Sequence, residues 1–140
     1  MVASRKSVPV LALAAALAVP GVAAGATLNA TLSGAKEVPK AGNGSGTAKL
    51  TLKPSSGQIC FDITLKHVGT AQMGHIHTGK AGVAGPIDVA LFMSPTKHPK
   101  GCVSASKSKI NAILRHPSRF YVNVHTKKFP AGAARGQLHH

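Results

Sequence analysis

The chain has 140 residues, of which 17 are Lys or Arg and only 3 are Asp or Glu, so its formal net charge is +14. Three carboxylates are too few for a Mg²⁺ or Ca²⁺ site built from several oxygen ligands, and a paired-carboxylate glycosidase would need two of the three. Trp is absent and there are four Phe and one Tyr, so few aromatic rings are available for stacking on nucleic-acid bases. The length suits a single domain.

The first 26 residues have the pattern of a secretory signal peptide. Two basic residues precede an apolar run over residues 8–19. The Ala-x-Ala pattern of Ala24 and Ala26 predicts cleavage after Ala26, and cleavage after Ala24 fits nearly as well. The apolar run is shorter than the roughly 20 residues that cross a bilayer, so no transmembrane segment is expected in the mature chain. We therefore expect a secreted, extracytoplasmic protein whose mature domain spans residues 27–140.

Two cysteines in an exported chain predict one disulfide. An even cysteine count in an oxidising compartment favours the pair Cys60–Cys102. The loop that this bond closes is long, and the chain-entropy model assigns such a loop about 4 kcal/mol of stabilisation. The alternative, a metal site with two Cys ligands, lacks the C-x-x-C spacing that such sites have.

Alternation of apolar and polar residues predicts seven short strands separated by Gly- and Pro-rich turns. The clearest pattern lies at 58–66, and the stretch 93–103 is expected to be irregular. A short helix is expected over 107–115, with Ser106 as its N-cap. Together these elements predict an all-β protein with an antiparallel sandwich or barrel. The predicted strands cover residues 27–33, 46–52, 58–66, 73–78, 87–92, 119–126 and 133–138.

Three histidines on two of these strands form a candidate metal site. Residues i and i+2 of a strand point to the same face, so His75 and His77 lie side by side. His125 belongs to another predicted strand and joins them if the two strands are neighbours. Three imidazole nitrogens suit Cu(II) or Zn(II) and leave one coordination position open. Asn123, Thr78 and backbone carbonyls are available as acceptors for the outer ring nitrogens.

The same histidines also have a purely structural interpretation. Buried histidines are often held by hydrogen bonds to protein groups, and these three would then pin the Gly-rich loop at 79–86. That loop lacks the G-x-x-x-x-G-K-[ST] pattern of a phosphate-binding loop, and the chain has no G-x-S-x-G motif. Arg135 either pairs with one of the three acids or guides anions toward the histidines.

Segments along nearly the whole mature chain resemble the CHRD (chordin) domain family, and in particular its bacterial secreted members. This resemblance implies a secreted or surface β-domain over residues 27–140, and Cys60 and Cys102 match a cysteine pair common in bacterial members. Ala133 stands where the family usually has an acid, which removes one candidate partner for Arg135. The matching segments are LSGAKEVP (32–39), G-x-A-x-L (46–50), GHIHTGKAGVAGPIDVAL (74–91), FYVNVHT (120–126) and P-A-G-x-x-R-G-Q-L (130–138).

The order of elements also resembles the copper–zinc superoxide dismutases, which have a Greek-key barrel or sandwich. That resemblance implies seven or eight strands here. By the same analogy His75, His77 and His125 match copper ligands, and Arg135 matches an anion-guiding arginine. The long zinc-binding loop of the dismutases has no counterpart at 79–86.

Two classes of function remain. The first, which we take as the main expectation, is a non-enzymatic extracellular module whose ligand is not established. Its high positive charge favours anionic cell-wall or surface polymers as partners, through an attraction that salt weakens, and no specific nucleic-acid motif is present. The alternative is a copper-binding protein that uses His75, His77 and His125, with dismutase-like redox activity as its extension. If these three side chains point to different faces, the metal hypothesis fails.

Overall fold

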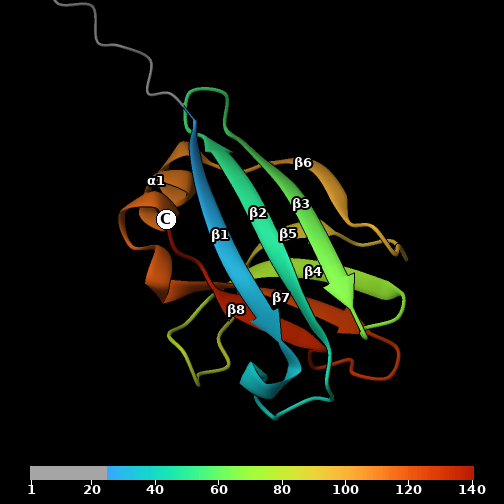
Figure 1. The fold of residues 1–140 in the computed structure, drawn as a ribbon. Helices are drawn as coiled ribbons and strands as arrows, with labels where there is room; N and C mark the ends of the chain where they lie inside the picture. Colours follow the sequence, from blue (N-terminus) through green and yellow to red (C-terminus); the bar gives the residue numbers. More distant parts are fainter. Residues whose placement is uncertain (1–24) are drawn as a thin grey trace, which may run out of the picture.

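The computed structural model describes residues 25–140, in which strands dominate (Figure 1). The predicted signal peptide, residues 1–26, lies outside the described residues except for Gly25 and Ala26. In chain order the elements are β1 (Ala26–Ser33), η1 (Gly34–Lys36), β2 (Ser45–Lys53), β3 (Gln58–Lys66), β4 (Ala71–Thr78), β5 (Ile87–Phe92), β6 (Lys100–Ser104), α1 (Lys107–Arg115), η2 (Pro117–Arg119), β7 (Phe120–Thr126) and β8 (Ala134–Gln137).

All strands belong to one antiparallel sheet that curls into a nearly closed barrel. Its eight strands follow the order β5-β4-β7-β8-β1-β2-β3-β6. The two end strands, β5 and β6, contact each other, so the sheet almost closes on itself. In Figure 1, β1, β2 and β3 cross over β4, β7 and β8. The predicted all-β barrel class is confirmed.

Apolar side chains at alternate strand positions fill the barrel interior. Ile59, Phe61 and Ile63 of β3 are buried there, as their spacing predicts. The prediction for β5 was partly wrong, because Ile87 is 57 % exposed. A bulge is the cause: Ile76 pairs with Val89, but His77 pairs with Ile87, which turns Ile87 to the outer face.

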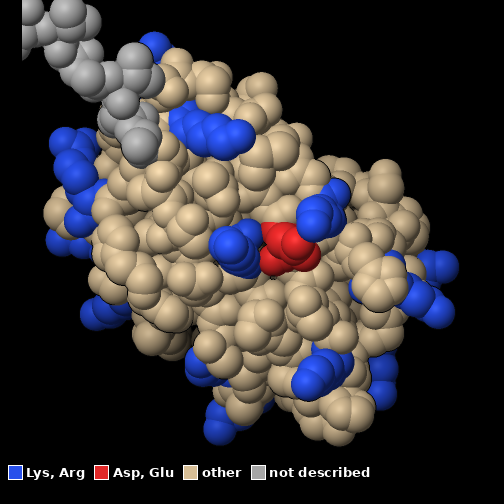
Figure 2. All heavy atoms as spheres, turned by 45° about the horizontal axis from the view of Figure 1, so that its top comes forward, with Lys and Arg blue, Asp and Glu red and all other residues tan. Residues whose placement is uncertain are grey.

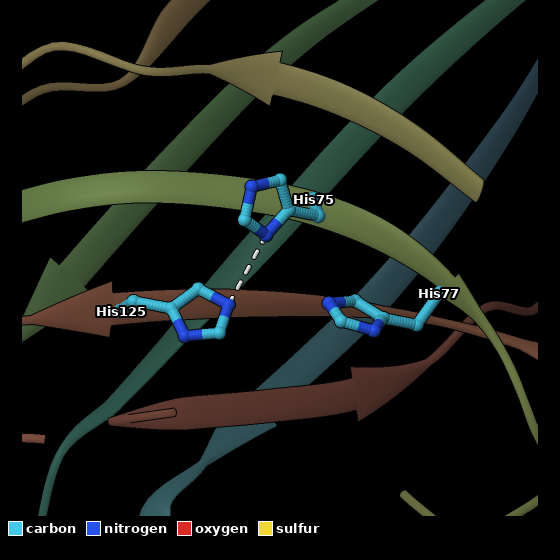
Figure 3. Close-up of side chains that lie close together, drawn as sticks. All are labelled: His75, His77 and His125. Atoms are coloured by element: carbon cyan, nitrogen blue, oxygen red, sulfur yellow. Dashed lines mark hydrogen bonds between the residues drawn. The ribbon is translucent and has the colours of Figure 1, made fainter. Parts of the chain in front are cut away.

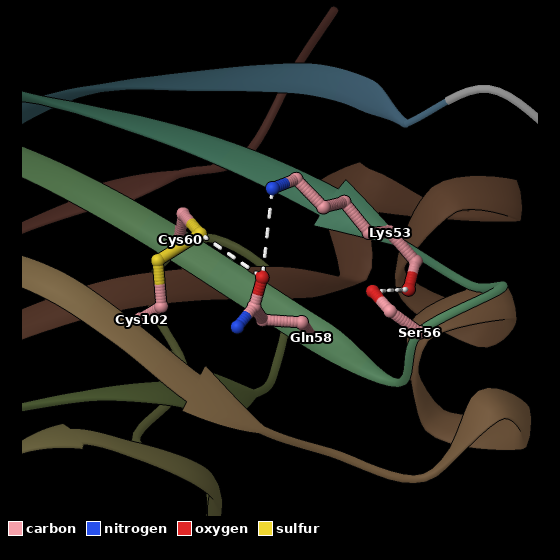
Figure 4. The surroundings of a disulfide bond; sticks show 5 residues. All are labelled: Lys53, Ser56, Gln58, Cys60 and Cys102. Atoms are coloured by element: carbon pink, nitrogen blue, oxygen red, sulfur yellow. Dashed lines mark hydrogen bonds between the residues drawn. A yellow bond between two sulfur atoms is a disulfide. The ribbon is translucent and has the colours of Figure 1, made fainter.

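A short strand, β6, occupies a stretch that was predicted to be irregular. Its five residues carry no clear apolar alternation, and it forms because its backbone pairs with β3. Cys60 and Cys102 lie directly opposite each other in this pairing. They form the predicted disulfide, which joins residues 42 positions apart (Figure 4). The amide oxygen of Gln58 lies 3.6 Å from the Cys60 sulfur and accepts a hydrogen bond from Lys53.

The helix α1 has the predicted bounds and the predicted cap. The Ser106 hydroxyl accepts a hydrogen bond of 3.3 Å from the Lys109 amide, and this satisfies one of the free amides of the first turn. Ile110 and Ile113 are fully buried on its inner face. Within the described residues, no helix has the length and apolar character needed to cross a membrane.

Loops cover the outer face of β4, β7 and β8. Every residue of β7 is buried, whereas β1 alternates between buried and exposed residues. The loop at 79–86 contacts this face through hydrogen bonds to Tyr121 and Arg135, and the turn after β7 contacts it through His125. Polar side chains on this face are therefore shielded from water.

Candidate metal centre

The three candidate histidines meet under these loops because β4 and β7 are neighbours (Figure 3). His75 and His77 project from β4 and His125 projects from β7, and their rings are turned toward one another. One ring nitrogen of each histidine lies within 4.8 Å of those of the other two. The side chains share one face, which the metal hypothesis required. All three residues are buried.

Hydrogen bonds to the backbone fix the orientation of two rings. His125 Nδ1 donates to the Pro130 carbonyl at 2.9 Å, and His77 Nδ1 donates to the Gly85 carbonyl at 2.9 Å. Each therefore carries its lone pair on Nε2, the nitrogen turned toward the cluster. His75 Nδ1 lies 3.1 Å from His125 Nε2 and donates to it. His77 Nε2 is buried and has no hydrogen-bond partner.

Burial keeps the three imidazoles neutral. Desolvation, together with the nearby His125 and His77, lowers the pKa of His75 to about 4. Desolvation also lowers the pKa of His77 and of His125, although their hydrogen bonds to Gly85 and Pro130 act in the opposite direction. A neutral imidazole is the form that binds a metal ion, so burial holds the three rings in the charge state that metal binding would need near neutral pH.

Tyr121, which the sequence argument did not single out, supports the cluster from the side. Its ring stacks on His77, with centroids 4.9 Å apart, and the Arg135 guanidinium lies 3.4 Å from its ring centroid. The Gly85 amide donates to the Tyr121 hydroxyl at 3.0 Å. Tyr121 is the residue opposite His77 in the strand pairing, so knowing that β4 and β7 are neighbours would have identified it.

The close approach of the loop to β4 depends on Gly85. A Cβ atom at this position would clash with the Thr78 carbonyl. Only glycine lets the backbone come near enough for the Gly85 carbonyl to accept the His77 hydrogen bond. The Gly-rich stretch immediately after His-x-His was the signal for this contact.

Arg135 holds the loop rather than an acid. It is 2 % exposed, and its guanidinium donates to the carbonyls of Val83 at 2.9 Å and Lys80 at 3.2 Å and to Gln137 Oε1 at 3.0 Å. No ion pair joins it to a carboxylate among the described residues. These bonds favour a role in fixing the loop over the anion-guiding role that the sequence also allowed.

The predicted side-chain acceptors do not serve the histidines. Asn123 lies opposite His75 in the strand pairing, but its Oδ1 has no hydrogen-bond partner. Thr78 is exposed. Backbone carbonyls, the third predicted option, are the acceptors, because the loop and the turn after β7 pass directly over the two rings.

Glu37 is a buried acid that sequence reasoning missed. It is 4 % exposed. Burial raises its pKa to about 7, although the Arg135 charge, the Asn123 side chain and the Val38 amide lower it. Its Oε1 has no hydrogen-bond partner. Nothing in the sequence marks a single loop acid as buried, and only the packing of its loop against the turn at Gly132 encloses it.

The family model of the CHRD domain matches residues 28–138. No curated protein and no solved structure matches the chain.

Proposed function

The chain belongs to the CHRD domain family, and we propose that it is an exported, non-enzymatic module that binds one copper ion. The ligands in this proposal are His75 Nδ1, His77 Nε2 and His125 Nε2. One observation carries it: His77 Nε2 is buried, unpartnered and turned toward two other ring nitrogens. A buried polar atom without a partner is costly, and a metal ion would satisfy it.

The chemistry of the cluster favours copper over other ions. All three candidate donors are imidazole nitrogens, and imidazole suits copper and zinc better than Mg²⁺ or Ca²⁺. Among divalent first-row ions, Cu(II) binds such a site most tightly. Binding requires that the proton on His75 Nδ1 moves to Nε2, and it replaces the hydrogen bond to His125. The bonds to Gly85 and Pro130 orient the other two rings without any rearrangement.

Binding is proposed rather than turnover because the surroundings restrict access. His75 is 2 % exposed, and His77 and His125 are 8 % exposed each. Arg135, the candidate anion guide, is engaged with the loop carbonyls. A redox enzyme would need a substrate to reach the metal, and the loop at 79–86 lies over the cluster.

Export is the proposed setting for this module. A disulfide persists in oxidising compartments, and the pattern at the start of the chain is that of a signal peptide. Ala26 is the first residue of β1 and pairs with Leu52. Cleavage after Ala24 would therefore leave β1 whole, whereas cleavage after Ala26 would remove its first residue.

The surface charge supports a second, weaker property, a salt-sensitive attraction to anionic wall or surface polymers. Lys and Arg side chains are spread over the face in Figure 2 rather than gathered in one patch. The two ion pairs of the described residues, Lys100–Asp62 and Lys109–Asp88, neutralise few of them. A spread of cations favours a general attraction to polyanions over recognition of one sequence or shape.

Calorimetric titration of the tag-free, metal-free mature protein with Cu(II) tests the copper proposal. We expect one ion per chain, and electron paramagnetic resonance should report coupling to imidazole nitrogens. His77→Gln should weaken binding by at least 100-fold, whereas His98→Gln, at an exposed histidine, should leave it within twofold. Circular dichroism checks that both variants are folded.

Two outcomes would overturn the proposal. One is the absence of one-to-one binding, and the other is equal binding by the wild type and a folded His77→Gln variant. Superoxide turnover by the copper-loaded protein is measured beside these titrations. Turnover that disappears in His77→Gln would replace the binding function with a redox enzyme on the same three ligands.

A further inference from the structure

A cavity of about 560 Å³ lies between the segment after β1 and the loop at 79–86, and none of the three histidines lines it. We call it the loop pocket. Ala35 and Val38 line it from the segment after β1, Ala81 and Gly82 line it from the loop, and Arg135 lines it from β8. Its volume is within the range of pockets that bind small organic molecules, roughly 300–1,000 Å³.

The charges around the loop pocket are predominantly positive. Lys36, Lys40 and Arg135 line it. The Lys36 ammonium donates to the Thr31 carbonyl at 3.1 Å, which holds this charge at the rim. Glu37 is the single acid in the lining, and burial raises its pKa to about 7, so it offsets the cations only in part. The pocket therefore attracts an anion.

Part of the remaining lining is apolar (Ala35, Val38 and Ala81), beside the polar Thr31, Gln137 and His139. Apolar side chains are also exposed on the bordering loops. Val38 is 40 % exposed, and Val83, on the loop that forms the opposite wall, is 42 % exposed. Exposed apolar side chains therefore stand on both loops that border the pocket. The neighbouring Ala35, Ala81 and Gly82 leave open the space that larger side chains would fill.

We propose that the loop pocket binds a small organic anion, one carboxylate on an apolar body. The carboxylate lies toward Lys36 and Lys40, and the apolar body lies between the walls that carry Val38 and Ala81. This binding does not need the metal ion. The two sites both contact the loop at 79–86, but each has its own ligand atoms.

Binding of 2-naphthoate to the metal-free mature protein tests the proposal. The chain has no Trp and one Tyr, so naphthalene fluorescence can be excited without interference from the protein. We expect saturable one-to-one binding of 2-naphthoate. Acetate has the charge without the body, and 2-naphthalenemethanol has the body without the charge, so each should bind at least tenfold more weakly.

Two pairs of variants locate the site. Lys40→Glu should weaken 2-naphthoate binding at least tenfold, whereas Lys66→Glu, an equal charge change at the exposed end of β3, should leave it within twofold. Ala81→Trp should abolish binding by filling the pocket, and Ala90→Trp, at an exposed position of β5, should not. All four changed residues are exposed, so the variants are expected to fold.

The proposal is overturned if 2-naphthoate fails to bind at millimolar concentration. It is also overturned if Lys40→Glu and Ala81→Trp bind as the wild type does, or if the alcohol binds as tightly as the acid. Because no metal is present, none of these results bears on copper binding. Conversely, a failed copper titration leaves the loop pocket unaffected.

Discussion

The two halves of the barrel wall differ in what covers their outer faces. On β2, Thr47 and Lys49 point outward, and Lys49 is exposed to water. On β7, Tyr121, Asn123 and His125 also point outward, but all three are buried under loops. Both strands alternate polar and apolar residues in the same way. The alternation therefore identifies the inner face and does not reveal whether the outer face meets water.

The covered half contains the candidate site, and bulk water does not satisfy its buried polar atoms. Three buried side-chain atoms of the described residues lack a partner, and they belong to Glu37, His77 and Asn123. His77 and Asn123 lie on the outer face of β4 and β7, and Glu37 packs beside Asn123 at Gly132. No such atom lies on the outer face of β1, β2 or β3. The buried polar side-chain atoms that lack a hydrogen-bond partner therefore all lie on one side of the described molecule.

The largest expected effect is a loss of stability, and it should differ between the inner and the outer face of the same strand, β4. Ile76 lies between His75 and His77 but points into the core and is fully buried. Ile76→Ala should lower the free energy of unfolding by about 2–5 kcal/mol in urea denaturation. His77→Gln should cost clearly less, because the His77 Nε2 makes no hydrogen bond and the Gln amide can still donate to the Gly85 carbonyl. Equal losses would mean that the covered face is a second core rather than a binding site.

The disulfide tests whether the two halves are independent. Replacing both cysteines, Cys60→Ser with Cys102→Ser, should lower the free energy of unfolding by about 2–4 kcal/mol, because the unfolded chain gains freedom. Copper affinity should remain within twofold, since the bond joins β3 to β6 and the histidines lie on β4 and β7. Calorimetry and urea denaturation of the same sample measure both. A parallel loss of copper affinity would contradict the independence of the halves.

Glu37 gives the covered half a pH dependence. Burial raises its pKa to about 7 from its ordinary value of 4.5. Between these pH values the folded protein holds a proton that the unfolded chain has released, so stability falls as pH rises. Glu37→Gln should remove this fall and stabilise the metal-free protein at pH 8 by about 1–3 kcal/mol.

Urea denaturation of the wild type and Glu37→Gln at pH 5 and pH 8 measures this effect. His75, whose pKa burial lowers to about 4, acts in the opposite direction below its ordinary value of 6.5. That contribution is common to both proteins and cancels in their difference. A difference that does not grow between pH 5 and pH 8 would show that Glu37 is not the responsible group.

The smallest effect on stability is expected on β1, β2 and β3, whose outer face is not covered by loops. Lys49→Gln changes an exposed side chain of β2, and it should alter the free energy of unfolding by less than about 0.5 kcal/mol. Copper affinity should not change. Urea denaturation and calorimetry check both. A larger effect would indicate that this face also has a covering partner or a structural role beyond solubility.

The sequence predicted what depends on local pattern and missed what depends on pairing. The helix bounds and the Ser106 cap followed from local signals, and the disulfide followed from the even cysteine count. Strand β6 was missed because only its partner β3 defines it, and Ile87 was assigned to the wrong face because a bulge is not visible in alternation.

The residues of the candidate site also fall into those that the local pattern predicted and those that it missed. His-x-His on one strand and a third histidine on another placed the ligands, and the structure brings them together. Tyr121 and Glu37 were not foreseen. Tyr121 is a neighbour across the sheet, and Glu37 is buried by a loop. Residue spacing in the sequence predicts neither the contact of Tyr121 across the sheet nor the burial of Glu37.

The stacking of Tyr121 on His77 has a spectroscopic consequence. Tyr121 is the single tyrosine of a chain without tryptophan, so the intrinsic ultraviolet emission of the protein comes mainly from this one ring. Its centroid is 4.9 Å from that of His77, and a paramagnetic ion held by the histidines would quench it. Tyr121 is thus an intrinsic fluorescent probe beside the histidine cluster. A titration that follows its emission would measure how much of the cluster has bound the metal ion, without any added label.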